Sequence, residues 1–464
     1  MSHRHDLVIL GSGTTAFAAA LKGARQGARV LMVEQGQLGG TCVNWGCIPS
    51  KTLIHLASVH FSAHRAVSFG LNIEAAFPDC GRLMAAKQHV VDTLRREHYQ
   101  KILDDNPRIE VLRGHGRFLS SRELQVGAEV VVSDRILIAA GGVPRVLRIP
   151  GLAEAGYLTS YSALNLPCFP ESLLIIGGGV IALEMGQMFR RFGTRVTVLE
   201  HSRSLLKEFD PRLTAMLRQL LEDEGMEFVF GVESQRVFRE GEDTCLEALV
   251  DGRPRMFRAS RLMLAVGTAP ATLGLGLEVA GVQLDGGGFI LTDEEMRTSQ
   301  PGIWAAGDVT GPPLIAPAGI REGEVAVENM LDPDAHRRIQ HRFTPMAVFI
   351  DPEIASVGDS PEQTRIQGKE VVESLVDLSR VAKSQVMGGR RGAILLIAEK
   401  DSGRILGCQI LAPRAADIIH EAALAVRCGL SVFDLAEMVH VYPTISDGLR
   451  LAALDNVRRR ESGG

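Results

Sequence analysis

The sequence predicts an α/β protein with two Rossmann-like dinucleotide-binding domains and a C-terminal α+β domain. The first observation is a repeated pattern of strand, glycine-rich turn, helix and second strand that ends in an acidic residue. One copy runs from Gly11 to Glu34 and the other from Gly177 to Glu200, with equal spacing from glycine to acid. The second observation is a change in the sequence pattern after about residue 335. There the sequence predicts short strands and helices, and the glycine-rich repeat does not occur a third time.

Length and composition narrow the class of protein. A chain of 464 residues predicts two to four domains at roughly 100–200 residues each. With 45% hydrophobic and 23% charged residues, it is neither disordered nor collagen-like. A net charge of −5 gives no basic surface for nucleic acid, and no apolar run approaches the roughly 20 residues of a membrane helix. We therefore expect no nucleic-acid or membrane partner and a cytoplasmic location.

The first copy of the repeat has the form G-x-G-x-x-A. The strand Asp6–Leu10 leads into a turn that contains Gly11, Gly13 and Ala16, and the helix after it is rich in alanine. Glycines at these places let the backbone approach a pyrophosphate, which binds at the N-terminus of the helix. Glu34, at the end of the second strand, is expected to accept hydrogen bonds from a ribose diol.

The second copy begins after the strand Ser172–Ile176 and predicts another dinucleotide site. Two dinucleotides in one chain indicate electron transfer, with a flavin and a nicotinamide as the expected pair. Glu200 favours NADH because a carboxylate accepts from the ribose 2′-OH and repels a 2′-phosphate, whereas Arg203 would favour NADPH. The residues expected at this site are Gly177, Gly179, Val180, Glu200, Arg203 and Gly267.

Three further strand-to-turn segments complete the expected nucleotide domains. They end at Gly141, Gly267 and Asp308, where a backbone turn or a carboxylate would face a cofactor. The chain is expected to divide into a first nucleotide domain at 1–150 completed by 269–338, a second at 151–268, and an interface domain at 339–464. In that last part the pattern predicts strands Met346–Ile350, Ser356–Gly358, Gly392–Ala398 and Ile405–Ala412, and helices Ala415–Cys428 and Val432–Val439.

Two cysteines follow the first repeat closely and are candidates for redox chemistry. In an ideal helix the Cα atoms of Cys42 and Cys47 would be about 8.6 Å apart, whereas a disulfide tolerates about 7 Å at most. If they pair, the helix must be distorted between them, and Asn44, Gly46 and Pro49 allow that. Two buried thiols or half of a metal site are the alternatives. A redox-active pair is favoured, because no cluster of cysteine or histidine nearby completes a zinc site.

The segment GGTCVNWGCIPSK at residues 39–51 resembles the pyridine nucleotide–disulfide oxidoreductases, and the likeness covers nearly the whole chain. The resemblance implies a glutathione-reductase-like fold, FAD in the first site, NADH or NADPH in the second, and a homodimer with a shared active site. It makes Cys42 the thiol that meets substrate, Cys47 the thiolate against the flavin, and Lys51 a flavin neighbour paired with Glu184. The FAD contacts it implies are Gly11, Gly13, Ala16, Glu34, Thr41, Lys51, Gly116, Gly141 and Asp308.

The C-terminal segment distinguishes members of this family. Disulfide reductases of the glutathione and lipoamide type carry a histidine where this chain has Tyr442, followed by a glutamate where it has Asp447. A phenol with a pKa of about 10 shuttles protons poorly near neutral pH compared with imidazole at about 6.5. Tyr442 and Tyr99 instead resemble the two active-site tyrosines of mercuric reductases. His440 is expected to be a packing or surface histidine, with a substitute role left open.

The expected reaction is reduction of Hg(II) or another soft metal ion or electrophile, with Cys42 and Cys47 as its transient ligands. The chain differs from mercuric reductases in having no vicinal cysteine pair after Cys428 and no N-terminal Cys-x-x-Cys domain. The alternatives are a dihydrolipoamide dehydrogenase-like disulfide oxidoreductase and a thiol-based metal-binding protein with little turnover. The remaining cysteines are expected to be buried structural thiols: Cys80, Cys168, Cys245, Cys408 and Cys428.

Overall fold

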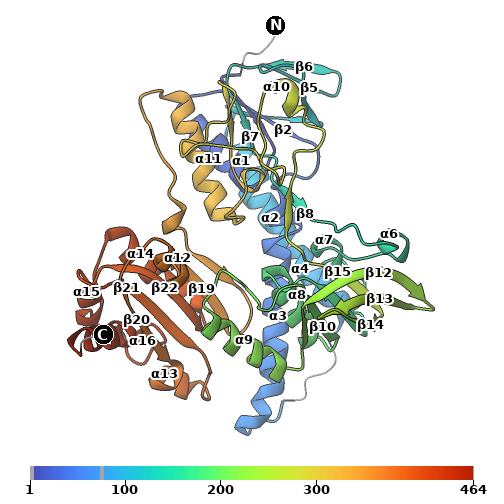
Figure 1. Ribbon diagram of the computed structural model, residues 1–464. Helices are drawn as coiled ribbons and strands as arrows, with labels where there is room; N and C mark the ends of the chain where they lie inside the picture. The colour runs from blue at the N-terminus through green and yellow to red at the C-terminus, as the bar shows by residue number, and fades with distance from the viewer. Residues whose placement is uncertain (1–4, 74–77, 463–464) are drawn as a thin grey trace.

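The computed structural model describes residues 5–73 and 78–462, which form three sheet-centred parts (Figure 1). The α/β class predicted from the sequence is confirmed. Within the described residues, no helix is both long and apolar enough to cross a membrane.

The first part is built on a parallel five-stranded sheet in the order β17-β7-β1-β2-β3. Its strands are β1 (Leu7–Leu10), β2 (Val30–Glu34), β3 (Ile109–Arg113), β7 (Ile136–Ile138) and β17 (Ile303–Ala305). Helices α1 (Thr14–Arg25) and α11 (Ala316–Leu331) lie against each other beside this sheet. All four residues of β1 are buried, which explains why this strand reads as a continuous apolar run. Strand β17 pairs with β7 although Ile303 and Ile136, which lie opposite each other, are 167 positions apart in the chain.

The second part repeats this plan with the order β11-β10-β9-β15. These parallel strands are β9 (Ser172–Ile176), β10 (Arg195–Glu200), β11 (Glu227–Phe230) and β15 (Arg261–Leu264). Helix α8 (Val180–Arg191) is buried over most of its length, and α9 (Pro211–Asp223) follows the capping residue Asp210. An antiparallel sheet extends this part through β12 (Val232–Glu240), β13 (Asp243–Val250) and β14 (Arg253–Ala259).

Short strands and helices connect and decorate these two parts. The antiparallel pair β8 (Gly142–Pro144) and β16 (Thr268–Pro270) lies where the chain leaves the first part and returns to it. The small elements of the first two parts are α2 (Gly40–Asn44), β4 (Gly116–Phe118), β5 (Glu123–Val126), β6 (Glu129–Val132), α6 (Leu152–Ala155), α7 (Ser160–Ala163) and α10 (Leu277–Ala280). The exact domain boundaries expected from the sequence stay a prediction.

The third part is an antiparallel sheet in the order β18-β19-β22-β21-β20, covered by helices. Its strands are β18 (Met346–Val348), β19 (Glu353–Gly358), β20 (Val371–Asp377), β21 (Ala393–Glu399) and β22 (Ile405–Ala412). Its helices are α12 (Pro361–Ile366), α13 (Ala382–Val386), α14 (Ala415–Cys428), α15 (Val432–Glu437) and α16 (Asp447–Glu461). The four strands and two helices expected from the sequence are present within a few residues, whereas β20, α12, α13 and α16 were not predicted.

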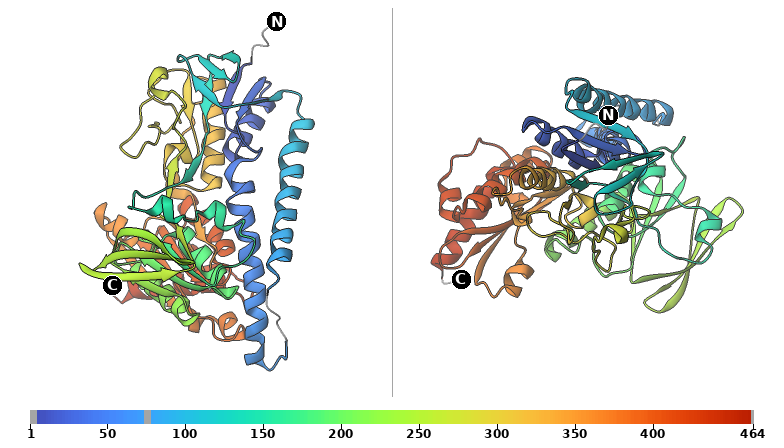
Figure 2. Two further views of the ribbon diagram at one scale, coloured as in Figure 1. Left: turned by 90° about the vertical axis from the view of Figure 1, so that its right-hand side faces the viewer. Right: turned by 90° about the horizontal axis from the view of Figure 1, so that it is seen from above.

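Two long helices run side by side along the first two parts (Figure 2). They are α3 (Cys47–Ala66) and α4 (Cys80–Arg95). Helix α4 continues into a π-helical turn, η2 (Arg96–Gln100), and then into α5 (Lys101–Asp104). Since α3 begins at Cys47 and also contacts α8, it links the cysteine pair to the second nucleotide part.

Candidate active site

The first glycine-rich turn has the geometry of a phosphate cradle. Gly11 has a φ of 117°, and a Cβ atom there would lie 2.3 Å from the carbonyl oxygen of Ala139. Helix α1 starts at Thr14 without a side-chain cap, so its first N–H groups face outward for an anion. The Glu34 carboxylate accepts hydrogen bonds from Ser12 Oγ and from the backbone N–H of Gly36. This arrangement fits the pyrophosphate and ribose of a dinucleotide.

The second turn has the same overall features as the first. Gly177 has a φ of 108°, and its Cβ would lie 2.4 Å from the carbonyl oxygen of Ala265. Helix α8 begins at Val180 and likewise has no side-chain cap. The carboxylate of Glu200 accepts from the N–H of Gly178 at 2.6 Å and from that of Ser202 at 2.7 Å. The second site therefore fits a dinucleotide by the same test.

Arg203, expected near the second dinucleotide, is engaged elsewhere. Its guanidinium lies 2.7 Å from Oδ1 of Asp251, which follows strand β13. Gly116, expected near FAD, packs closely on strand β1: a Cβ there would lie 2.6 Å from Leu10 Cδ2. A larger residue at 116 would therefore need the Leu10 side chain to shift, and a role of Gly116 toward FAD stays a prediction.

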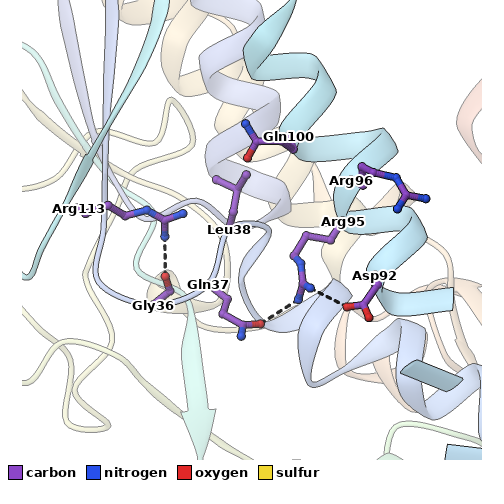
Figure 3. Close-up of a pocket in the computed structure, with 8 residues that line it drawn as sticks. All are labelled: Gly36, Gln37, Leu38, Asp92, Arg95, Arg96, Gln100 and Arg113. Atoms are coloured by element: carbon purple, nitrogen blue, oxygen red, sulfur yellow. Dashed lines mark hydrogen bonds and ion pairs between the residues drawn. The ribbon is translucent and has the colours of Figure 1, made fainter. Parts of the chain in front are cut away.

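A cavity of about 470 Å³ opens beside the loop that follows Glu34 (Figure 3). Arg113 donates to the carbonyl oxygen of Gly36 at 2.6 Å, and Arg95 donates to Gln37 Oε1 at 3.0 Å and to Asp92 Oδ1 at 2.6 Å. The cavity is lined by Gly36, Gln37, Leu38, Asp92, Arg95, Arg96, Gln100 and Arg113. The cavity offers space and hydrogen-bond donors next to the loop that follows Glu34, and the sequence does not predict it.

The helix that the cysteine pair would occupy is interrupted, as predicted. Helix α2 ends at Asn44 and α3 begins at Cys47, with Trp45 and Gly46 in non-helical conformations between them. The Asn44 side chain donates to the carbonyl oxygens of Leu38 and Gly40 and so holds the end of α2 in place. Cys42 therefore lies in one helix and Cys47 at the first position of the next.

The two thiols have unequal affinities for a proton. The Cys42 thiol donates a hydrogen bond to the sulfur of Cys47, which lowers the pKa of Cys47 to about 7 against the opposing effect of burial. The positive charge of Lys51 lowers it further, and the N-terminus of α3 favours a negative charge in the same direction. The same hydrogen bond raises the pKa of Cys42. The arrangement therefore stabilises a thiolate on Cys47 and a neutral thiol on Cys42.

Lys51 contacts residues of the second and third parts of the chain. Its Nζ lies 2.6 Å from Oε2 of Glu184 and 4.9 Å from the centre of the Phe349 ring. Oε1 of Glu184 accepts from the backbone N–H of Phe349 at 3.0 Å, and the Glu184 side chain is 5% exposed. The ion pair expected from the family resemblance is therefore present in the structure.

Tyr99 belongs to the π-helical turn η2 and lies close enough to Cys42 and Cys47 for their charges to act on it. Its ring is buried and meets the Phe17 ring edge-on at 4.7 Å. Burial raises the pKa of Tyr99, and the neighbouring charges of Cys42 and Cys47 raise it further. The phenol therefore stays protonated at neutral pH and can donate a hydrogen bond toward the sulfurs.

Tyr161 is a site residue that the sequence analysis missed. Its hydroxyl lies 3.1 Å from Thr41 Oγ1, and its ring stacks on Trp45 at 6.0 Å. Burial raises the pKa of Tyr161 and also that of Asp308, whose charge acts on Tyr161. Two tyrosines thus flank the cysteine-bearing segment, one from η2 and one from α7.

The C-terminal residues expected at the site lie elsewhere within one chain. The Tyr442 side chain is 71% exposed on the third part, and the Asp447 carboxylate accepts from Arg450 Nε at 2.8 Å. His440 points inward, where its Nε2 lies 2.8 Å from Oε1 of Glu421 and its side chain is 3% exposed. One protomer therefore presents Tyr99 to the cysteines, and Tyr442 faces outward.

The other cysteines differ in part from expectation. Cys245 and Cys408 are buried, and burial raises the pKa of Cys408. Cys80 is half-buried, whereas Cys168 and Cys428 are exposed, so the expectation of buried thiols was wrong for Cys168 and Cys428. Each is at an element end or in a connecting loop, where an apolar sequence neighbourhood does not require burial.

Comparison with known proteins identifies the family. Residues 5–326 match the model described as pyridine nucleotide-disulphide oxidoreductase, and residues 344–453 match its dimerisation domain. The chain belongs to the pyridine nucleotide-disulphide oxidoreductases. It is an FAD-dependent, NAD(P)H-dependent disulfide oxidoreductase, and the glutathione-reductase-like arrangement expected from the sequence is confirmed.

Several relatives of this oxidoreductase match over almost its full length. A mercuric reductase from Staphylococcus aureus is 37% identical over 450 residues, which cover 97% of this chain and 82% of that protein. A dihydrolipoyl dehydrogenase from Thermus scotoductus is 35% identical over 451 residues, which cover 97% of this chain and 96% of that protein. Among solved structures, the Cu(II) complex of the HOCl-induced flavoprotein disulfide reductase RclA from Escherichia coli has a TM-score of 0.88 at 27% identity. That alignment covers 97% of this chain and 99% of the other.

Proposed function

We propose that this oxidoreductase reduces a soft metal ion, with Hg(II) as the first candidate, and uses NADH as the electron donor. The observation that carries the proposal is the absence of a free imidazole among the described residues of the exposed segment around Tyr442. His440 is bound to Glu421 inside the protomer, and Tyr442 takes the exposed position. Without a nearby proton shuttle, a dithiol or disulfide substrate is poorly served, whereas a metal ion bound by two sulfurs needs no proton on the substrate.

Each residue of the site has a separate role in the proposed reaction. When bound, FAD supplies two-electron chemistry between the nicotinamide and the cysteine pair. Cys42 and Cys47 release their protons and bind the ion as two thiolates, and Lys51 offsets the negative charge that gathers there. The buried Tyr99 phenol offers a neutral hydrogen-bond donor beside the sulfurs. The reaction balances as NADH plus Hg(II) giving NAD⁺, H⁺ and Hg(0), with both electrons from the nicotinamide.

The proposal includes a homodimer that completes the active site. The segment 439–442 carries apolar side chains that one chain leaves exposed: Val439 is 93% exposed, Val441 79% and Tyr442 71%. An exposed apolar surface of this kind is typical of a protein interface, and the third part matches a dimerisation domain. We place Tyr442 of the partner subunit beside Cys42, and the enzyme in the cytoplasm, where NADH is supplied.

The test is anaerobic NADH oxidation by the FAD-loaded enzyme with four acceptors: an Hg(II)–thiol complex, Cu(II), lipoamide and glutathione disulfide. We expect the metal ions to be reduced faster than either disulfide, and Tyr442→Phe to slow the metal reaction. Lipoamide turnover far above the metal rate would instead assign the activity of the dihydrolipoyl dehydrogenase relative. Rapid metal binding without NADH oxidation would assign a metal-binding protein.

A further inference from the structure

Helix α3 carries a pair of histidines far from the cysteines. His60 and His64 are four residues apart and therefore lie one turn apart on the same face. Their Nε2 atoms are 3.2 Å from each other, and the two rings are perpendicular with centroids 4.5 Å apart. His60 is half-buried and His64 is exposed, so both nitrogens are accessible at the surface.

The separation of the two nitrogens suits a shared metal ion. Imidazole nitrogens bind divalent ions at about 2.0–2.1 Å. Two such bonds at a tetrahedral angle place the nitrogens about 3.3 Å apart, and at a right angle about 2.9 Å apart. The observed 3.2 Å lies between these limits. An ion could therefore replace the hydrogen bond between the rings with little movement of the helix.

We propose that His60 and His64 form a bidentate site for a borderline divalent metal ion, either Cu(II), Ni(II) or Zn(II). Neutral imidazoles prefer these ions to Mg²⁺ or Ca²⁺, and the usual order of affinities puts Cu(II) first. Among the described residues, no cluster of three histidine, cysteine or carboxylate ligands occurs, so water completes the coordination.

This site is separate from the proposed active site. His60 lies thirteen positions after Cys47 on the same helix, which at about 1.5 Å per position is about 20 Å. An ion on the histidines therefore cannot share ligands with the thiols. The nearby guanidinium of Arg191 is neutralised by Glu224 at 2.8 Å and Asp351 at 3.0 Å, which limits its repulsion of a cation.

The test uses Zn(II), which is not reduced, on the oxidised FAD-loaded enzyme followed by isothermal titration calorimetry. We expect the wild type to bind one more Zn(II) per chain than either His60→Ala or His64→Ala. Each variant should weaken that binding at least about tenfold, because even changes next to a metal ligand cost about 10- to 100-fold. His55→Ala is the matched control on the same helix and should bind as the wild type does.

Flavin absorbance and melting temperature in the absence of metal show whether each variant is folded. Equal Zn(II) stoichiometry and affinity in the wild type and in both variants would overturn the proposal. So would loss in only one of the two variants, because a bidentate site needs both rings. The outcome is independent of the acceptor that the enzyme reduces.

Discussion

Lys51 Nζ lies 2.6 Å from Glu184 Oε2, and this ion pair joins the helix that carries Cys47 to the helix that begins at the second glycine-rich turn. Because Glu184 also accepts from the backbone of Phe349, the contact reaches the third part of the chain. The two partners act on Cys47 in opposite directions: Lys51 lowers its pKa and Glu184 raises it. The pair therefore affects both the pKa of Cys47 and the packing of the three parts against one another.

Substitution of each partner should shift the titration of Cys47 in opposite directions. Lys51→Met removes a positive charge and should raise the pKa of Cys47, whereas Glu184→Gln removes a negative charge and should lower it. The measurement is the long-wavelength thiolate–flavin absorbance of the reduced, FAD-loaded enzyme as a function of pH. Lys22→Met is the control, since Lys22 forms an ion pair of the same length with Glu328 away from the cysteines. Shifts in the same direction for both variants would contradict this assignment.

The wild-type thiolate should titrate near neutral pH. Since the pKa of Cys47 is lowered to about 7, the thiolate–flavin absorbance should be full above about pH 8 and lost as the pH falls through 7. The largest cause is the hydrogen bond from Cys42, so Cys42→Ala should move the midpoint to higher pH. Cys47→Ser should abolish the band. A band that persists in Cys47→Ser would mean that Cys42, and not Cys47, faces the flavin.

The parts of this site that the sequence predicts are encoded locally. Each glycine-rich turn and its acid lie within one short stretch, and the interrupted helix follows from Asn44, Gly46 and Pro49 between and after the cysteines. The Lys51–Glu184 pair connects residues 133 positions apart. It was expected only through resemblance to a family, because no spacing rule reaches that far.

The parts that the sequence does not predict depend on contacts distant along the chain. Tyr161 meets Thr41 across 120 residues, and Arg113 meets Gly36 across 77. The inward orientation of His440 depends on Glu421 in a neighbouring helix. Cys168 is exposed although its neighbours in the sequence are apolar. Whether a side chain is buried depends on distant parts of the chain that pack over it, and the local sequence does not determine this.

Arg191 should be a major source of stability at the junction of the three parts. Its side chain is 2% exposed and lies 2.8 Å from Glu224 and 3.0 Å from Asp351. Arg191→Met removes the buried guanidinium that these two carboxylates share and should cost about 3–5 kcal/mol. The measurement is the denaturant midpoint of the FAD-loaded enzyme. Arg218→Met removes an exposed pair with Glu222 and should cost about 0–1 kcal/mol. Equal losses in the two variants would refute a special role for the buried network.

The coenzyme site should prefer NADH. The Glu200 carboxylate is held at the N-terminus of α8 by the N–H of Gly178, where it would repel a 2′-phosphate, and Arg203 is drawn away by Asp251. We therefore expect a higher kcat/KM with NADH than with NADPH, and a reduced preference in Glu200→Gln. A wild type that uses NADPH as well as NADH would contradict this expectation.

Release of Arg203 tests the second half of that explanation. Asp251→Asn should free the guanidinium for a 2′-phosphate and raise kcat/KM for NADPH while leaving the value for NADH unchanged. Because the Arg203–Asp251 pair is exposed, its rupture costs only about 0.2–1 kcal/mol. The gain is therefore limited to about fivefold, since about 1.4 kcal/mol is needed for tenfold. Glu242→Gln, which removes an exposed carboxylate from the turn between β12 and β13, is the matched control and should change neither value. An equal gain in that control would show that net charge, and not Arg203, sets the preference.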